Sequence, residues 1–378
     1  MIASVFRDVF KVNLGVKSTE RCLVFTDSPS PCEESGPLDS ERRTSLRCLA
    51  YLASEVGKGI ARDVRLLDYP ATCIHGAEPP AALWEAAFGE KAVAALRKQG
   101  VLDALVGKNA DDAVMLKAEK IIARYRNYAV DAVVALSFYS TSHTLFRKLL
   151  TGTCGTRYAS MPLFDMPMLE GPMSADWKEV AGLTRAVTAR VNRAERVEIS
   201  TPNGTRLSFS ILGRKALSDT GLLTRPGSFG NLPGGESFVA PLEGTARGTL
   251  VLEWGATREL ASPLTLTVLN GAVMAVAGKE PYADYLRDRL AERPENANIA
   301  EFGIGTNNRA QRPDNILESE KIKGTVHIAL GDNSTFGGII STPFHQDFVF
   351  FKPTVRLVLR DGTRELLMKD GSFRGVRP

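Results

Sequence analysis

The stretch "DAVVALSF", residues 131–138, is the strongest strand candidate in the first half of the chain. Two other apolar runs precede it, "RCLVFTDS" at 21–28, which ends in turn residues, and "DVRLLDYP" at 63–70. Helical patterns separate these runs at 41–60 and 79–100. Strands that alternate with helices, with no hairpin turns between them, predict a mostly parallel sheet covered by helices.

The second half of the chain has a different pattern. A helical segment at 174–194 leads into "RVEISTPNGTRLSFSI", two alternating runs around a central Asn-Gly pair, which is a strong hairpin signal. Further β-type runs follow at 248–254, 263–276 and 297–304, and the C-terminal end turns at an Asp-Gly pair into another hairpin. This pattern predicts a β-rich α+β domain.

The length of the chain also favours two domains, because 378 residues exceed what one hydrophobic core usually serves. We expect an α/β N-terminal domain with a mostly parallel sheet at 1–172. A β-rich α+β catalytic domain, which binds metal, is expected at 173–378. Hydrophobic residues make up 44% of the chain and charged residues 24%, which is typical of a globular protein and excludes a mainly disordered one.

Charge and hydropathy exclude several classes of partner. The net charge is only +4 and no basic run is long enough to follow a phosphate backbone, so nucleic acid is not expected. Charged residues interrupt the N-terminal segment before an apolar stretch of signal-peptide length develops, and the longest apolar run, 129–139, is too short to span a bilayer. Five cysteines without a C-x-x-C pair predict reduced thiols. We therefore expect a cytoplasmic protein that does not bind membranes.

Two of the four histidines fall within "GTVHIALGDNSTFGGIISTPFHQDF", residues 324–348. His327 lies in an apolar strand pattern. His345 and Asp347 are two positions apart, so on a strand both side chains point to one face. Scarce histidines next to an acid suggest a metal site, although a histidine in a β run is more often structural.

Two glutamates extend this set. Glu301 lies within the otherwise apolar run "NIAEFGIGTN", where an unpaired carboxylate would cost roughly several kcal/mol, and a metal cation would remove that cost. Glu236 follows two glycines in "FGNLPGGESFVAP". With His327, His345 and Asp347, these acids form a ligand set for one or two divalent metals such as Zn, Co or Mn. In a non-enzymatic binding module, arginines would neutralise the acids instead.

The segments "NLPGGESFVAP", "NIAEFGIGTN", "ILESEKIKGTVHIALGDNSTFGG" and "PFHQDF" resemble the motif series of the M29 metallo-aminopeptidases of the aminopeptidase T and aminopeptidase S type, which are leucyl aminopeptidase-like. The resemblance implies two divalent metals per chain. The implied ligands are Glu236, Glu301, His327, His345 and Asp347, with Glu301 or Asp347 bridging the metals. Glu320 in "ESEK" would be a general base or would support the ligands.

If the resemblance holds, a metal-activated water would release N-terminal residues from a peptide substrate, with Glu301 and Glu320 as catalytic carboxylates, in a homodimer. The chain departs from aminopeptidase T-like sequences, because no tyrosine stands between "HIALG" and His345. The alternative is a mononuclear Fe(II) enzyme of the ring-cleaving 2,5-dihydroxypyridine dioxygenase type, in which His327, His345 and Asp347 hold the iron. In either case His143, in "SFYSTSHT" after the 131–138 strand, is a candidate substrate contact.

Overall fold

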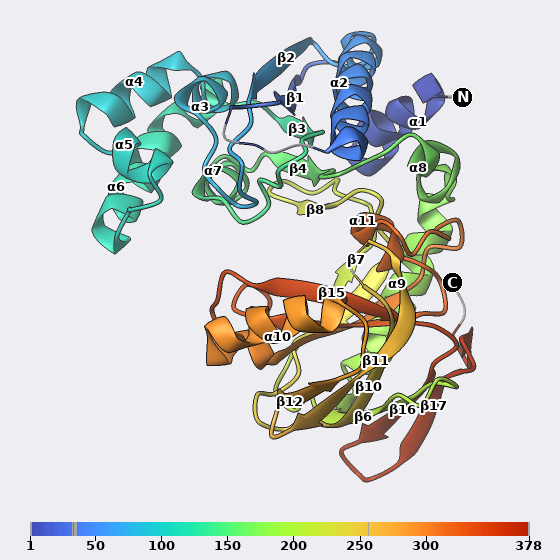
Figure 1. The fold of residues 1–378 in the computed structure, drawn as a ribbon. Helices are drawn as coiled ribbons and strands as arrows, with labels where there is room; N and C mark the ends of the chain where they lie inside the picture. Colours follow the sequence, from blue (N-terminus) through green and yellow to red (C-terminus); the bar gives the residue numbers. More distant parts are fainter. Residues whose placement is uncertain (1, 32, 34–35, 256, 377–378) are drawn as a thin grey trace. The chain divides into compact units, whose positions relative to one another are not determined.

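The computed structural model describes residues 2–31, 33, 36–255 and 257–376. It divides into two compact units, which are described separately below (Figure 1). Unit 1 comprises Met1–Ser174 and Gly221–Pro233, and unit 2 comprises Ala175–Thr220 and Gly234–Pro378.

The compact units differ from the expected domains at one segment. The sequence predicts residues 221–233 within the C-terminal domain, whereas they cluster with unit 1. The reason is strand pairing: β8 (Phe229–Asn231) runs parallel to β4 (Arg157–Ser160) and extends the sheet of unit 1. A three-residue strand has too little pattern to be assigned to a sheet from sequence.

Unit 1 is an α/β unit built on a five-stranded sheet of order β2-β1-β3-β4-β8, in which every pairing is parallel. The predicted mostly parallel sheet is confirmed. Strands β1 and β3 are largely buried, as expected for strands covered on both faces, whereas β2 is only partly buried. The strands not yet given are β1 (Arg21–Ser28), β2 (Asp63–Pro70) and β3 (Ala132–Ala135).

Helices cover the sheet of unit 1. Helix α2 contacts β1 and β2, while Leu23 and Phe25 of β1 pack in a core shared with α3 to α7. The single helix expected at 79–100 is two helices, because Gly89 between them has a φ of +86°. The helices are α1 (Ile2–Asp8), α2 (Pro37–Lys58), α3 (Ala81–Phe88), α4 (Glu90–Lys98), α5 (Leu102–Val106), α6 (Asp112–Tyr125), α7 (Leu145–Leu149) and α8 (Pro167–Glu170), with short turns η1 (Val9–Asn13), η2 (Arg126–Tyr128), η3 (Leu150–Cys154) and η4 (Pro172–Ser174).

Unit 2 contains two antiparallel sheets. The eight-stranded sheet has the order β12-β11-β10-β6-β5-β16-β17-β18, and the five-stranded sheet has the order β15-β14-β13-β9-β7. The expected hairpins are present as β5–β6 and β16–β17. The strands are β5 (Ala194–Ser200), β6 (Arg206–Ser210), β7 (Leu217–Asp219), β9 (Glu236–Val239), β10 (Arg247–Trp254), β11 (Glu259–Leu269), β12 (Ala272–Ala277), β13 (Ile299–Gly305), β14 (Val326–Gly331), β15 (His345–Phe350), β16 (Thr354–Leu359), β17 (Arg364–Lys369) and β18 (Ser372–Phe373).

The two sheets of unit 2 share one hydrophobic core. Leu207 and Leu250 of the larger sheet and Phe302 and Ile328 of the smaller one belong to the same buried cluster, together with Val187 of α9. The predicted β-rich α+β arrangement is confirmed. The helical elements of this unit are α9 (Trp177–Val191), α10 (Tyr282–Glu292), α11 (Ile316–Ser319) and the short turn η5 (Pro294–Ala297).

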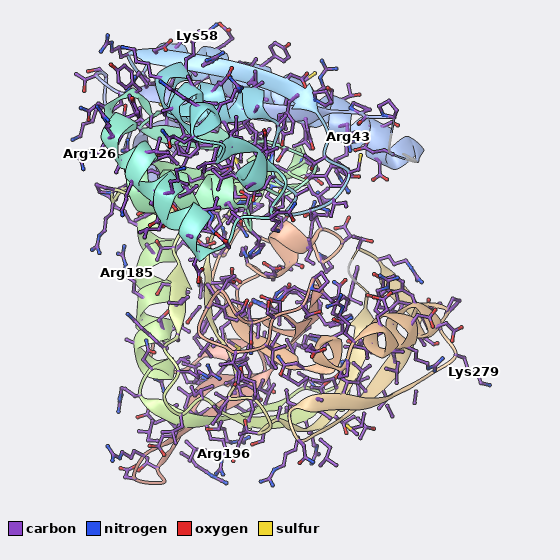
Figure 2. All side chains as sticks on the ribbon, turned by 90° about the vertical axis from the view of Figure 1, so that its left-hand side faces the viewer. Arg43, Lys58, Arg126, Arg185, Arg196 and Lys279 are labelled. Carbon is purple, nitrogen blue, oxygen red and sulfur yellow. The ribbon has the colours of Figure 1, made fainter. Side chains whose placement is uncertain are left out.

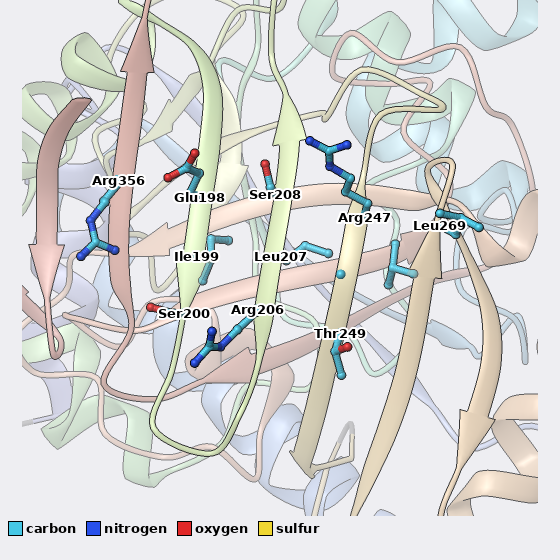
Figure 3. Close-up of a pocket in the computed structure, with 12 residues that line it drawn as sticks. Glu198, Ile199, Ser200, Arg206, Leu207, Ser208, Arg247, Thr249, Leu269 and Arg356 are labelled. Atoms are coloured by element: carbon cyan, nitrogen blue, oxygen red, sulfur yellow. The ribbon is translucent and has the colours of Figure 1, made fainter. Parts of the chain in front are cut away.

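The other face of the eight-stranded sheet carries polar side chains. Arg206 and Arg247 lie diagonally across β6 and β10, and Arg356 lies beside Glu198 in the pairing of β16 with β5 (Figure 3). These residues line an open hollow of about 750 Å³. Alternation of polar and buried residues along these strands is the pattern of a sheet with one face on the core.

Cationic side chains are distributed over different elements. Arg43 and Lys58 lie on α2, Arg185 on α9 and Arg196 on β5 (Figure 2). Arg43 is almost fully buried, 4.1 Å from the ring of Phe138.

The cysteines depart in part from expectation. Cys22, Cys48 and Cys154 are free thiols, as predicted, but Cys73 is disulfide-bonded. Cys32 lies outside the described residues. Among the residues that the structure describes, no helix combines the length and the apolar character needed to cross a membrane.

Candidate metal centre

One face of the five-stranded sheet forms the core of unit 2, and the opposite face carries the candidate site. Successive residues of a strand point to opposite faces. Phe302 and Ile304 of β13 lie in the core, so Glu301 points the other way. In β14, Ile328 lies in the core and its neighbour His327 does not. The alternation of the sequence thus places acids and imidazoles together on the face away from the core.

Strand register brings small residues beneath these side chains. His327 pairs with Gly303 on β13, Asp347 pairs with Ala329 on β14, and Glu236 pairs with Gly305. The space over Gly303 is filled by the imidazole, because a Cβ atom there would stand 1.9 Å from Nε2 of His327.

The five predicted ligands form two groups that share one carboxylate. Glu236, Glu301 and His327 form the first group, and Glu301, His345 and Asp347 form the second. In each group the potential ligand atoms lie within 4.8 Å of one another. Nε2 of His327 lies 3.3 Å from Oε1 of Glu301, and Nε2 of His345 lies 3.6 Å from its Oε2. Glu301 is the carboxylate common to both groups, and its role as a bridge between two metals stays a prediction.

The donor atoms fit a divalent cation. Oδ1 of Asp347 is buried and has no hydrogen-bond partner among the described residues, whereas Oε2 of Glu236 lies 3.3 Å from Nε2 of His327. A buried carboxylate oxygen without a partner is costly, and a bound cation removes that cost. Carboxylate and imidazole donors suit zinc, manganese, cobalt and iron.

The two groups differ in exposure and orientation. The side chain of His327 is 1% exposed, whereas that of His345 is 34% exposed and marks the open side of the site. Nδ1 of His345 lies 2.8 Å from the carbonyl oxygen of Asp332. By donating to that carbonyl, Nδ1 leaves Nε2 directed at Glu301 and Asp347, the arrangement in which a neighbouring acceptor fixes the tautomer of a ligand histidine.

A buried lysine completes the first group. Nζ of Lys321 lies 2.6 Å from Oε1 of Glu236 and 2.6 Å from Oε2 of Glu320, and its side chain is 0% exposed. Burial opposes its charge, but the two carboxylates raise its pKa well above the ordinary value. Burial raises the pKa of both Glu236 and Glu320, although Lys321 opposes that shift. Lys321 therefore occupies one side of the Glu236 carboxylate as a cation.

The histidines are held in an acidic environment. Burial disfavours the charged form of His327, but its hydrogen bond to Glu301 and the charge of Glu236 outweigh burial and raise the pKa to about 9. For His345 burial is likewise outweighed, mainly by Asp347, and the pKa rises to about 10. Burial raises the pKa of Asp347, but His345 overcomes this and holds it below the ordinary value. Without metal, the cluster is stabilised by protonated imidazoles.

The remaining sequence expectations have mixed outcomes. His327, His345 and Asp347 do not form a separate group among the described residues, because Glu301 lies between His327 and the other two. Glu320 lies beside the first group and belongs to neither group.

His143 is an exposed residue of unit 1, and its role as a substrate contact stays a prediction. The roles of the five grouped residues as metal ligands also stay a prediction.

Sequence reasoning missed two features of the site, Lys321 and Gly303. Lys321 follows Glu320 directly in "ESEKIKG". A lysine next to an acid, just before an apolar strand, was the signal for a buried ion pair. For Gly303, the signal was the alternation in "EFGIG", which puts glycines on the face that carries Glu301.

The chain combines an α/β unit with a β-rich unit that carries a largely buried cluster of acids and histidines, the donor set of a candidate metal centre. The sequence profile of the NicX family, described as 2,5-dihydroxypyridine 5,6-dioxygenase, matches residues 171–373, which is more than half of the chain. The chain belongs to this family. The match contains all five residues of the two groups.

A curated relative shows the same relationship over a shorter stretch. The chain is 30% identical over 151 residues to 2,5-dihydroxypyridine 5,6-dioxygenase of Pseudomonas putida KT2440. The alignment spans 35% of this chain and 42% of that relative, less than half the length of either protein.

Two solved structures share the fold. The first is 2,5-dihydroxypyridine dioxygenase from Pseudomonas putida KT2440, with a TM-score of 0.68, 20% identity, and coverage of 99% of this chain and 97% of that one. The second is wild-type AmpT from Thermus thermophilus, with a TM-score of 0.57, 16% identity and coverage of 98% of both chains. The similarity to AmpT supports the M29-type fold, whereas the family match is to the dioxygenase.

Proposed function

We propose that this chain is a metal-dependent dioxygenase that cleaves a hydroxylated, nitrogen-containing aromatic ring of the 2,5-dihydroxypyridine type. The observation that carries the proposal is the ion pair between the ammonium group of Lys321 and the carboxylate of Glu236. Lys321 already occupies one side of the first group, so a metal ion there would meet a second positive charge in a buried environment. The second group has no lysine or arginine among its ion pairs with described residues and is open at His345.

Glu301, His345 and Asp347 would therefore hold one metal ion, with His327 on the other oxygen of Glu301 as the nearest further imidazole. An Fe(II) ion bound there would supply the redox chemistry with which oxygen attacks an electron-rich ring. The surrounding residues orient the ligands and balance the charge of the carboxylates. The carbonyl oxygen of Asp332 orients His345, and Lys321 pairs with Glu236 and Glu320 away from the open side.

The family membership supports the same reaction class, because the profile match includes the whole set of candidate ligands. A second candidate function is the expected metallo-aminopeptidase with two metals. The specific observation in its favour is that Glu301 is shared by two groups of three ligands, as a bridging carboxylate of a two-metal hydrolase would be.

Metal content and substrate turnover separate the two functions. We expect the purified protein to contain about one equivalent of iron per chain and to consume oxygen with 2,5-dihydroxypyridine. About two equivalents of zinc, cobalt or manganese per chain, together with release of p-nitroaniline from leucyl-p-nitroanilide, would overturn the proposal in favour of the aminopeptidase.

The compartment and the oligomeric state are further proposals. We propose that the protein acts in the cytoplasm as a homodimer. Size-exclusion chromatography with light scattering tests the dimer, and a monomeric mass would exclude it.

A further inference from the structure

Two phenylalanines stand beside the ligand groups and do not belong to the core of unit 2: Phe238 shares a strand with Glu236 of the first group, and Phe336 contacts His345 of the second. Phe238 is two residues after Glu236 on β9, so both side chains point to the face of the sheet that carries the site. The flanking residues Ser237 and Val239 are buried, whereas Phe238 is only half-buried, although β9 has a strand on each side. A half-exposed aromatic ring on an interior strand faces an opening and not the core.

The second ring comes from the loop between the two histidine strands. Phe336 is half-buried, and its ring centroid lies 5.7 Å from that of Phe238 at an interplanar angle of 74°. The same ring lies 6.1 Å from the imidazole of His345 at 89°. The two phenylalanine rings therefore meet edge to face next to the open side of the candidate metal centre.

The loop that carries Phe336 is held in a defined shape. Asn333 is fully buried; its Oδ1 accepts from the amide of Ile340 and its Nδ2 donates to Glu243. Glu243 also accepts from the amide of Ile339. A Cβ atom at Gly338 would stand 1.9 Å from Cγ of Asn333, so the loop closes tightly around this amide. Phe336 is thus presented by a fixed loop.

We propose that Phe238 and Phe336 form the aromatic wall of a subsite that binds the planar ring of the substrate next to His345. This inference rests on the proposed function and adds the residues that select a flat ring. Phenylalanine has no hydroxyl group, so the wall contributes packing and excludes water but donates no hydrogen bond. In this proposal the planar ring of the substrate would pack against the half-exposed faces of Phe238 and Phe336.

Ring binding tests the subsite directly. The wild type and the variants Phe336→Ala, Phe336→Tyr and Ile339→Ala are loaded with Zn(II) and titrated with 2,5-dihydroxypyridine without oxygen, with leucinamide as the competing class of ligand. We expect Phe336→Ala to bind the ring about tenfold more weakly, and Phe336→Tyr to bind within about threefold of the wild type. Ile339, 78% exposed on the same loop, is the matched control and should leave the affinity unchanged.

The outcomes separate the subsite from the proposed function. The affinity of each variant for Zn(II) should stay within about threefold of the wild type, since Phe336 is not a ligand. Equal ring affinity in Phe336→Ala and wild type would overturn the subsite but leave the dioxygenase proposal intact. A wild type that binds leucinamide and not the ring would overturn both.

Discussion

The imidazole of His327 lies over Gly303 of the neighbouring strand, and a Cβ atom at position 303 would stand 1.9 Å from its Nε2. We therefore expect Gly303→Ala to displace His327 from Glu301 and to lower metal affinity by about 10- to 100-fold, the range observed when the surroundings of ligands are disturbed. Isothermal titration with Zn(II) measures the loss.

The matched control for this substitution is Gly152→Ala, because no atom lies within 4 Å of a Cβ at that position. It should bind metal like the wild type. Unchanged metal affinity in Gly303→Ala would show that His327 does not contribute to metal binding.

Removal of the buried ammonium of Lys321 should destabilise the metal-free protein. Lys321→Met leaves Glu236 and Glu320 buried without their cation, and breaking a buried ion pair typically costs about 3–5 kcal/mol. Urea unfolding in the presence of a chelator measures the change. Adding Glu236→Gln to Lys321→Met removes one orphaned charge and should recover part of the loss; a double variant less stable than Lys321→Met would contradict this account.

The two ligand groups can be separated by one substitution in each. If one metal ion is held by Glu301, His345 and Asp347, Asp347→Asn should weaken metal binding by more than about tenfold, whereas Glu236→Gln should change it by less than about threefold. Glu301→Gln should affect binding most, because both groups use that carboxylate. Metal counts and affinities of the three variants provide the measurement. Loss of half the bound metal in Glu236→Gln would instead indicate two metal ions.

Much of the fold follows from the sequence because local patterns determine it. The run at 131–138 and the helices around it predicted the parallel sheet, and the Asn203–Gly204 turn predicted the hairpin β5–β6. Strand β8 could not be predicted, because its three residues carry no period and its pairing with β4 spans more than 60 residues of chain. The helical periodicity at 79–100 predicted one helix, but the positive φ of Gly89 ends the first helix there.

The site was partly predictable for a similar reason. The placement of His345 and Asp347 on one face follows from their spacing along a strand, and the cost of burying Glu301 singled it out. The division of the ligands into two groups depends on the register of β13, β14 and β9, which a single sequence does not specify. The partner of Lys321 depends on the same register, because Glu236 is 85 residues away.

Metal binding should depend strongly on pH. The pKa values of His327 and His345, about 9 and about 10 without metal, leave both imidazoles protonated at pH 7. A metal ion binds only the neutral imidazole, so binding must release protons, and apparent affinity should rise with pH until it passes these pKa values. We expect at least about one proton released per metal ion at pH 7, measured by titration calorimetry in buffers with different ionisation enthalpies. His75→Asn, in unit 1, should release the same number, whereas metal affinity that does not change between pH 6 and 9 would rule out His345 as a ligand.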